Sequence, residues 1–152
     1  MKIKIFYIII ILFLGFCSPN APISIESGKE ECTFCKMRII DLRFNTQLQT
    51  DKGRIYHFDS IECMVNWIKE NPDIKIKNAW VKDYLTENWI EYKKAIYFIS
   101  PDIPSPMGAN LSAYNNKKEI EELQNQNKQG QVFKWEELFQ YINSTKKHEH
   151  HH

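Results

Sequence analysis

Sulfur-containing side chains are concentrated in the stretch ECTFCKM, residues 31–37, which holds Cys32, Cys35 and Met37. A C-x-x-C pair brings two sulfur atoms close enough to chelate one metal ion or to form a disulfide. A zinc ribbon would need a second such pair, and covalent haem attachment would need histidine directly after Cys35. The sequence has neither, so the pair alone fits a metal ligand set, a local disulfide or two idle thiols.

Three further residues extend this set of sulfur atoms. Cys63 falls in the first turn of an expected helix, where backbone N–H groups favour a thiolate, so it fits either a ligand or a small buried side chain. For Met64, on the apolar stripe of that helix, core packing is the favoured interpretation. Met107 lies in the turn SPMG, which buries little, and there a ligand role is favoured. Thiolates and thioethers together select Cu(I), whereas Zn(II) prefers imidazole or more thiolates, so the set predicts a copper site.

The N-terminus has the layout of an export signal. Two lysines precede an unbroken apolar run over residues 5–16, which would extend about 18 Å as a helix. A membrane-spanning helix needs about 20 apolar residues, so an uncleaved anchor is the less favoured alternative. The run ends at Cys17, as in bacterial lipoproteins whose mature chain begins with an acylated cysteine. We therefore expect residues 1–16 to be a signal peptide and Cys17 to carry the lipid, including palmitate, that holds the protein at the membrane.

Composition and charge exclude some classes of partner. The chain has 20 Lys plus Arg and 19 Asp plus Glu, and loss of Lys2 and Lys4 with the signal peptide leaves a net charge of −1. No basic stripe interleaved with aromatic residues appears, which excludes nucleic acid as a partner. Three cysteines remain after Cys17, and an odd number in an exported chain argues against a disulfide framework. One Cys32–Cys35 bridge would still fit an oxidising envelope.

The mature chain divides into three parts. Residues 17–31, the lipidated cysteine followed by a polar stretch, are expected to be a flexible tether. Residues 32–146 are long enough for one small domain, with an aromatic core because the chain holds nine Phe, seven Tyr and four Trp. Residues 147–152 form a His-rich tail, which could bind metal weakly or could be an added purification tag.

The pattern of the domain predicts an α+β fold made of two small sheet-plus-helix halves. In the first half we expect a hairpin over residues 38–58, with strands at 38–50 and 54–58, then a helix over 59–72. Asp59 or Ser60 would cap this helix, and Asp59 with Glu62 has the spacing of a capping box. In the second half we expect strands at 78–84, 92–100 and 131–135, a loop at 101–110, and helices at 117–130 and 136–144. Gly130 would end the first of these two helices.

Four stretches resemble, in order and spacing, the NosL-like family of nitrous oxide reductase accessory lipoproteins. They are CTFCKMRIIDLRFNTQL, YHFDSIECMVNWI, WVKDYLTENWIE and SPMGANLSAY, and the likeness covers roughly residues 32–142. The resemblance implies one compact domain of two related β/α halves, which agrees with a loose echo between the helix regions of the two halves. It also implies an envelope lipoprotein that binds Cu(I) and delivers it for assembly of a copper–sulfur centre.

The resemblance also implies a ligand set. Cys35 and Met37 match the Cys-x-Met of the family and Met107 matches its loop methionine, while Cys32, Cys63 and Met64 match only the branch with extra sulfur atoms. Lys36 stands where the family usually has glycine. On this interpretation Cys35, with Cys32 or Met37, forms one side of the site and Met107 closes it from the second half.

We therefore expect a copper chaperone without catalytic activity, held by its lipid in the bacterial envelope and facing the periplasm or the exterior. It would deliver Cu(I) by ligand exchange to a copper-receiving enzyme, nitrous oxide reductase by the resemblance, or to the assembly complex of that enzyme. His57 could be a fourth ligand, although a histidine satisfied by local contacts is favoured. Two alternatives are a thiol–disulfide oxidoreductase that uses Cys32 and Cys35, and a structural zinc domain that would need His57 beside the three thiols.

Overall fold

The computed structural model of the protein describes residues 20–126 and 129–145. The expected signal peptide, the expected lipidation site Cys17 and the His-rich tail lie outside these residues. Of the helices described, none is long and apolar enough to cross a membrane.

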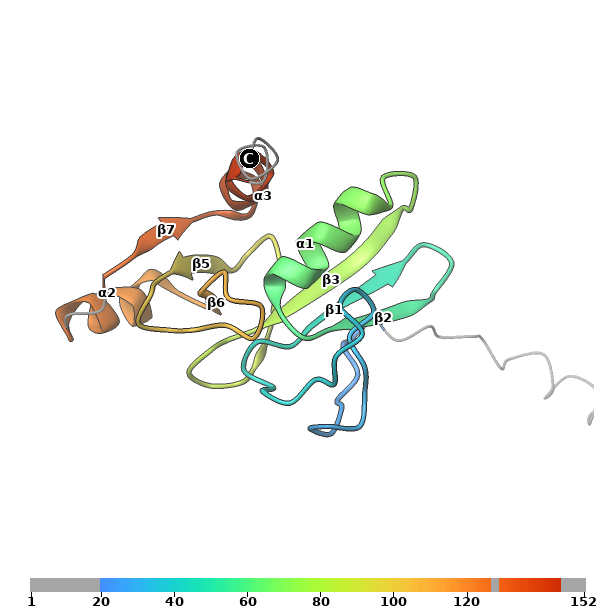
Figure 1. The fold of residues 1–152 in the computed structure, drawn as a ribbon, viewed down its shortest axis with the longest axis horizontal. Coiled ribbons are helices and arrows are strands. Elements are labelled where there is room, and N and C mark those ends of the chain that lie inside the picture. The colour runs from blue at the N-terminus through green and yellow to red at the C-terminus, as the bar shows by residue number, and fades with distance from the viewer. Residues whose placement is uncertain (1–19, 127–128, 146–152) are drawn as a thin grey trace, which may run out of the picture.

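The first half is a four-stranded antiparallel sheet with one helix packed on it (Figure 1). The sheet has the order β2-β1-β3-β4, and the helix α1 contacts β1 and β2. The elements are β1 (Thr46–Thr50), β2 (Ile55–Phe58), α1 (Ile61–Glu70), β3 (Ile76–Lys82) and β4 (Trp89–Glu91). The predicted hairpin is confirmed as the pair β1–β2, but its first strand begins at Thr46 rather than at residue 38. The strand predicted at 78–84 is β3, and it pairs with β1 in this sheet rather than in the second half.

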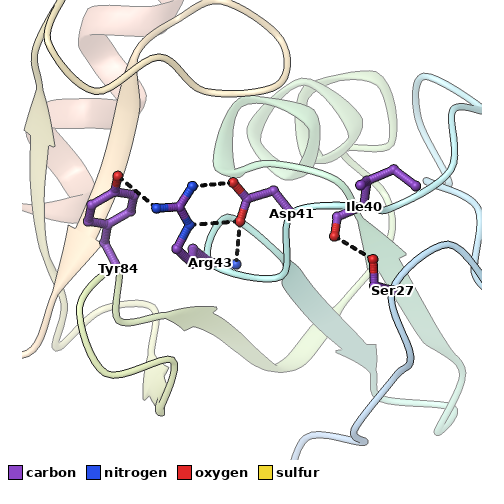
Figure 2. A network of polar contacts seen from close by, with 5 residues as sticks. All are labelled: Ser27, Ile40, Asp41, Arg43 and Tyr84. Carbon is purple, nitrogen blue, oxygen red and sulfur yellow. Dashed lines mark hydrogen bonds and ion pairs between the residues drawn. The ribbon is translucent and has the colours of Figure 1, made fainter.

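A turn explains why the first strand starts late. The Asp41 carboxylate accepts hydrogen bonds from the backbone N–H and the guanidinium of Arg43, and Phe44 N–H donates to the carbonyl of Asp41. Arg43 also donates to the hydroxyl of Tyr84, beyond β3, so the turn is fixed to the sheet (Figure 2). These local bonds replace the extended conformation that the apolar alternation alone would favour.

The second half is a three-stranded antiparallel sheet, with α2 and α3 beside it (Figure 1). Its order is β6-β5-β7, and its elements are β5 (Ile96–Ile99), β6 (Leu111–Tyr114), α2 (Lys117–Asn125), β7 (Gln131–Phe133) and α3 (Trp135–Thr145). The α+β fold with two sheet-plus-helix halves is thus confirmed. The strands β4 and β6 were not predicted.

Gly130 has a different role from the predicted helix stop. The helix α2 ends earlier, at Asn125. A Cβ atom at Gly130 would lie 2.3 Å from the carbonyl oxygen of Ile99 and 2.6 Å from the ring of Phe98. The glycine therefore permits the close approach of the chain to β5, directly before β7.

Residues 23–31 differ from the flexible tether expected there, because they form a strap along the first sheet. Ile23 N–H donates to the side chain of Gln47 at 2.8 Å, and the amide of Gln47 donates back to the carbonyl of Ile23. The Ser27 hydroxyl donates to the carbonyl of Ile40 at 2.7 Å (Figure 2). Gln47 is fully buried as a result. A polar strand face that the alternating pattern would leave to solvent is here covered by chain, and the hydrogen bonds satisfy its buried amide.

Candidate metal centre

Cys32, Cys35 and Cys63 form a cluster of thiols between the strap and α1. Their three Sγ atoms all lie within 4.8 Å of one another, and all three thiols are free. Cys32 and Cys63 are fully buried, whereas Cys35 is half-buried. Among the His, Cys, Asp and Glu residues of the described ranges, this is the only group of three or more close enough to share a metal ion.

The C-x-x-C stretch is the tip of a hairpin whose first arm is the end of the strap. Hydrogen bonds join Gly28 N–H to the carbonyl of Ile39, Ile39 N–H to that of Glu30, and Cys32 N–H to that of Met37. The hairpin turns through residues 32–37, where Lys36 N–H donates to the carbonyl of Cys32 at 3.0 Å. Lys36 has a φ of 65°, a left-handed conformation that glycine adopts without steric cost. The glycine that the resemblance implies at this position would therefore fit the turn without strain.

The second element that contributes a thiol is α1. The N-cap of this helix is Ser60, with an extended backbone and a hydroxyl oxygen that accepts Cys63 N–H at 3.3 Å. The strand β2 ends two residues earlier, and its backbone binds the hairpin tip because Thr33 N–H donates to the carbonyl of His57 at 2.8 Å. A strand end, a helix start and a hairpin tip therefore converge on the three sulfur atoms.

The polar surroundings favour one thiolate in the cluster. The hydrogen bond from the Cys63 thiol lowers the pKa of Cys32 to about 5, and backbone N–H groups of Asp59, Cys35 and Phe34 act in the same direction. The same hydrogen bond and burial raise the pKa of Cys63. Burial also raises the pKa of Cys35. These shifts favour a thiolate at Cys32, which is a good ligand for a soft cation, and the two other thiols can lose their protons when a metal binds.

The methionines occupy three different environments. Met64 is fully buried in the main hydrophobic core, as the apolar stripe of α1 predicted. Met37 and Met107 are exposed, at 47% and 39% of their surface. Met107 lines a cavity of about 400 Å³ together with Phe34, the neighbour of Cys35, and Glu62, the neighbour of Cys63. Met107, from the second half, thus lines the same cavity as the sequence neighbours of Cys35 and Cys63.

The sequence matches the family model described as NosL over residues 22–142. The chain belongs to the NosL family. The match begins within the polar stretch expected to be a tether, in agreement with the strap seen in the structure. Among curated proteins, none matches the sequence.

A solved structure shares the fold. It is the crystal structure of the copper chaperone NosL from Shewanella denitrificans, and it superposes on this chain with a TM-score of 0.66. The two sequences are 20% identical, and the match covers 78% of this chain and 96% of the other. This NosL fold is what the resemblance implied.

His57 and Asp59 lie near the thiols but outside the cluster. The Nδ1 atom of His57 is buried without a hydrogen-bond partner, and burial lowers the pKa of this side chain. No carboxylate or imidazole in the described part of the chain joins the three sulfur atoms within the same 4.8 Å. Burial, followed by the charge of Cys32, raises the pKa of Asp59 to about 6.

Sequence reasoning missed the role of Glu62. Its spacing from Asp59 suggested a capping box, but Ser60 is the cap. The Glu62 carboxylate turns instead to the loop of residues 101–110, between β5 and β6, called the Met107 loop below. The side chain is only 3% exposed although it lies off the apolar stripe of α1. A hint was available in the neighbouring loop, because the prolines at 104 and 106 indicate a rigid turn whose free N–H groups need an acceptor.

Proposed function

We propose that this NosL family member binds one Cu(I) ion through the thiols of Cys32, Cys35 and Cys63 and passes it to a copper-receiving enzyme. The observation that carries the proposal is the convergence of three free thiols within 4.8 Å, from two separate elements, in a fold shared with a protein described as a copper chaperone. Soft sulfur ligands select Cu(I) among the common metal ions of proteins. Copper is here a cargo rather than a resident cofactor, and no catalytic role is assigned.

The number of ligands favours Cu(I) over structural zinc. Structural zinc sites almost always have four protein ligands in a tetrahedron. Within residues 20–126 and 129–145, the three sulfur atoms have no fourth His, Cys, Asp or Glu ligand in their group, and His57 does not supply one. A three-sulfur set leaves the metal open to an incoming ligand, which a site for delivery needs and a structural site does not.

Transfer would proceed by stepwise exchange of sulfur ligands. Cys35 is the most exposed member of the cluster, so a donor of the receiving protein would replace its sulfur first, while the buried Cys32 and Cys63 still hold the ion. The exposed thioethers of Met37 and Met107 are neutral and weak donors that can bind the ion during the exchange. On the family likeness we propose nitrous oxide reductase, or its assembly complex, as the recipient.

We also propose that the protein is exported and held at the envelope membrane by a lipid on Cys17. The support is the apolar run of residues 5–16, which ends directly at this cysteine. Replacing Cys17 with Ala should move the protein from the membrane fraction to the soluble fraction. Retention in the membrane fraction would show that residues 5–16 remain as an anchor.

Burial argues against the alternative of a thiol–disulfide oxidoreductase. Its attacking thiol must be accessible and have a lowered pKa. Cys32 has the lowered pKa but is fully buried, and the more accessible Cys35 has a raised one. The two requirements fall on different residues, whereas a metal site needs no single exposed nucleophile.

An anaerobic titration of the reduced domain with Cu(I) and with Zn(II) tests the proposal. We expect one Cu(I) per chain, bound tightly enough to compete with a Cu(I) chelator, and markedly weaker binding of Zn(II). The control is a variant in which the three cysteines are replaced by serine, which should lose the Cu(I) site. Tight one-to-one Zn(II) binding with weak Cu(I) binding would contradict the proposal.

A further inference from the structure

One carboxylate joins the helix of the thiol cluster to the loop of Met107. The Oε1 atom of Glu62 accepts hydrogen bonds from the hydroxyl of Ser105 and, at 3.4 Å, from the backbone N–H of Ala109. The partners are 43 and 47 residues away in the sequence. These bonds bridge the two halves of the protein, because Glu62 belongs to α1 and the loop precedes β6.

The Glu62 carboxylate is buried. Glu62 is 3% exposed, and its second carboxylate oxygen, Oε2, is buried without a hydrogen-bond partner. Among the ion pairs of the described residues none involves Glu62. Burying a carboxylate without a cation has a high desolvation cost. The Glu62 carboxylate has this cost and no ion pair. Its burial is therefore better explained by the hydrogen bonds that it makes to the Met107 loop than by a contribution to the stability of α1 alone.

Ser105 connects the Glu62 carboxylate to the rest of the turn through further hydrogen bonds. Its hydroxyl oxygen also accepts the backbone N–H of Asn110 at 3.0 Å, and its carbonyl accepts Gly108 N–H at 2.9 Å. Gly108 has a φ of 77°, a left-handed conformation that closes the turn. Met107 lies at the tip of this turn, directly before Gly108, whose N–H is bound by the carbonyl of Ser105. Fixing Ser105 therefore fixes the backbone that carries the thioether.

We propose that Glu62 is a positioning residue that holds Met107 at the thiol cluster, so that Met107 takes part in Cu(I) binding. The inference rests on the proposed function. Glu62 directly precedes Cys63 in the first turn of α1, so one short piece of helix sets the place of both a cluster thiol and the loop anchor. Glu62 and Met107 line the same cavity, together with Phe34 from the C-x-x-C hairpin.

The test compares Glu62→Ala with Glu62→Gln. Alanine removes the acceptor of both loop hydrogen bonds, and we expect Cu(I) affinity to fall about tenfold. Glutamine keeps a carbonyl oxygen for Ser105 and Ala109, so its affinity should stay within about threefold of wild type. The measurement is competition with a Cu(I) chelator under anaerobic conditions, on variants shown by circular dichroism to be folded.

A matched control separates positioning from general loss of stability. Asp83 is also a fully buried carboxylate that holds a loop, through backbone N–H groups of Leu85, Thr86 and Asn115. None of these partners belongs to the thiol cluster or to the Met107 loop. We therefore expect both Asp83→Ala and Glu62→Ala to lower the melting temperature, but Asp83→Ala to leave the Cu(I) affinity unchanged. An equal loss of affinity in the two variants would overturn the proposal.

A double-mutant cycle shows whether Glu62 acts through Met107. If it does, Glu62→Ala in a Met107→Leu background should cause no further loss of Cu(I) affinity. The positioning role would be overturned if the losses of Cu(I) affinity from the two substitutions multiplied in the double variant, or if Met107→Leu had wild-type affinity. In either case the cysteine cluster could still bind copper. Failure of the proposed function has a different signature, because the wild-type protein itself would then not bind Cu(I).

Discussion

The thiol cluster and the Met107 loop are two sides of one proposed site, and they are built in opposite ways. Cys32 and Cys63 are fully buried, and the pKa of Cys32 is lowered by hydrogen bonds from a thiol and three backbone N–H groups. Met107 is 39% exposed, and its turn is attached to the helix by the carboxylate of Glu62.

The difference suggests a division of tasks. A buried, hydrogen-bonded thiol cluster loses little conformational entropy when a metal binds, so it favours strong retention of the ion. An exposed thioether on a single anchored turn contributes less to affinity, but it can be reached by another protein. Changes in the thiol cluster should therefore cause a larger loss of Cu(I) affinity than changes in the loop.

The largest effect is expected from the buried thiols. Replacing Cys63 or Cys32 with Ser removes a soft ligand and leaves a hard oxygen in a buried place, so Cu(I) affinity should fall by about a hundredfold or more, or ~2.7 kcal/mol. Chelator competition measures the change. Met64→Leu is the matched control, because Met64 is the buried neighbour of Cys63 but packs in the core. An equal loss in the Met64 variant would make Met64 a ligand.

The second effect concerns the strap that supports the thiol side. A mature chain that begins at Glu30 lacks the hydrogen bonds of Ile23 and Ser27, and it uncovers the buried side chain of Gln47. Relative to a chain that begins at Asn20, we expect a loss of about 2–4 kcal/mol in the free energy of unfolding, from several hydrogen bonds and an unpaired amide. Urea unfolding measures it. Equal stability of the two chains would show that the strap is a tether after all.

The third prediction addresses the exposed thioethers together. A Met37→Leu, Met107→Leu double variant keeps the size and apolar character of both side chains but loses both soft donors. We expect its Cu(I) affinity to fall by about 10- to 50-fold, less than for either buried thiol, with stability nearly unchanged. Chelator competition and thermal melting measure the two quantities. A larger loss than in Cys63→Ser would invert the comparison between the two sides.

The smallest effect is expected at the hairpin tip. Lys36→Gly relieves a left-handed conformation but increases the freedom of the unfolded chain, so the stability should change by less than about 1 kcal/mol. Lys36→Val should lower it by about 1–2 kcal/mol, because a β-branched residue disfavours this conformation. Urea unfolding of the metal-free protein compares them. A stable valine variant would mean that the tip has another conformation in solution.

Local patterns were sufficient for most elements of the fold but not for the contacts between the halves. The stripe of Ile61, Met64 and Val65 predicted the face of α1, and the spacing of Cys32 and Cys35 predicted two neighbouring thiols. The burial of Gln47 was not predictable, since the strap that covers it has few apolar residues of its own. Convergence of Cys63 with the other thiols, and of Glu62 with the Met107 loop, depends on long-range packing that no periodicity encodes.

The nearest neighbours of the bound metal provide the most direct test of the central claim. X-ray absorption spectroscopy on the protein loaded with one Cu(I) per chain reports the number and type of ligand atoms. We predict three sulfur neighbours, or four where Met107 also binds, together with a Cu(I) edge and no nitrogen or oxygen ligand from His57, Asp59 or Glu62. A shell dominated by nitrogen or oxygen, or an unchanged spectrum when Cys32, Cys35 and Cys63 are all replaced by serine, would contradict it.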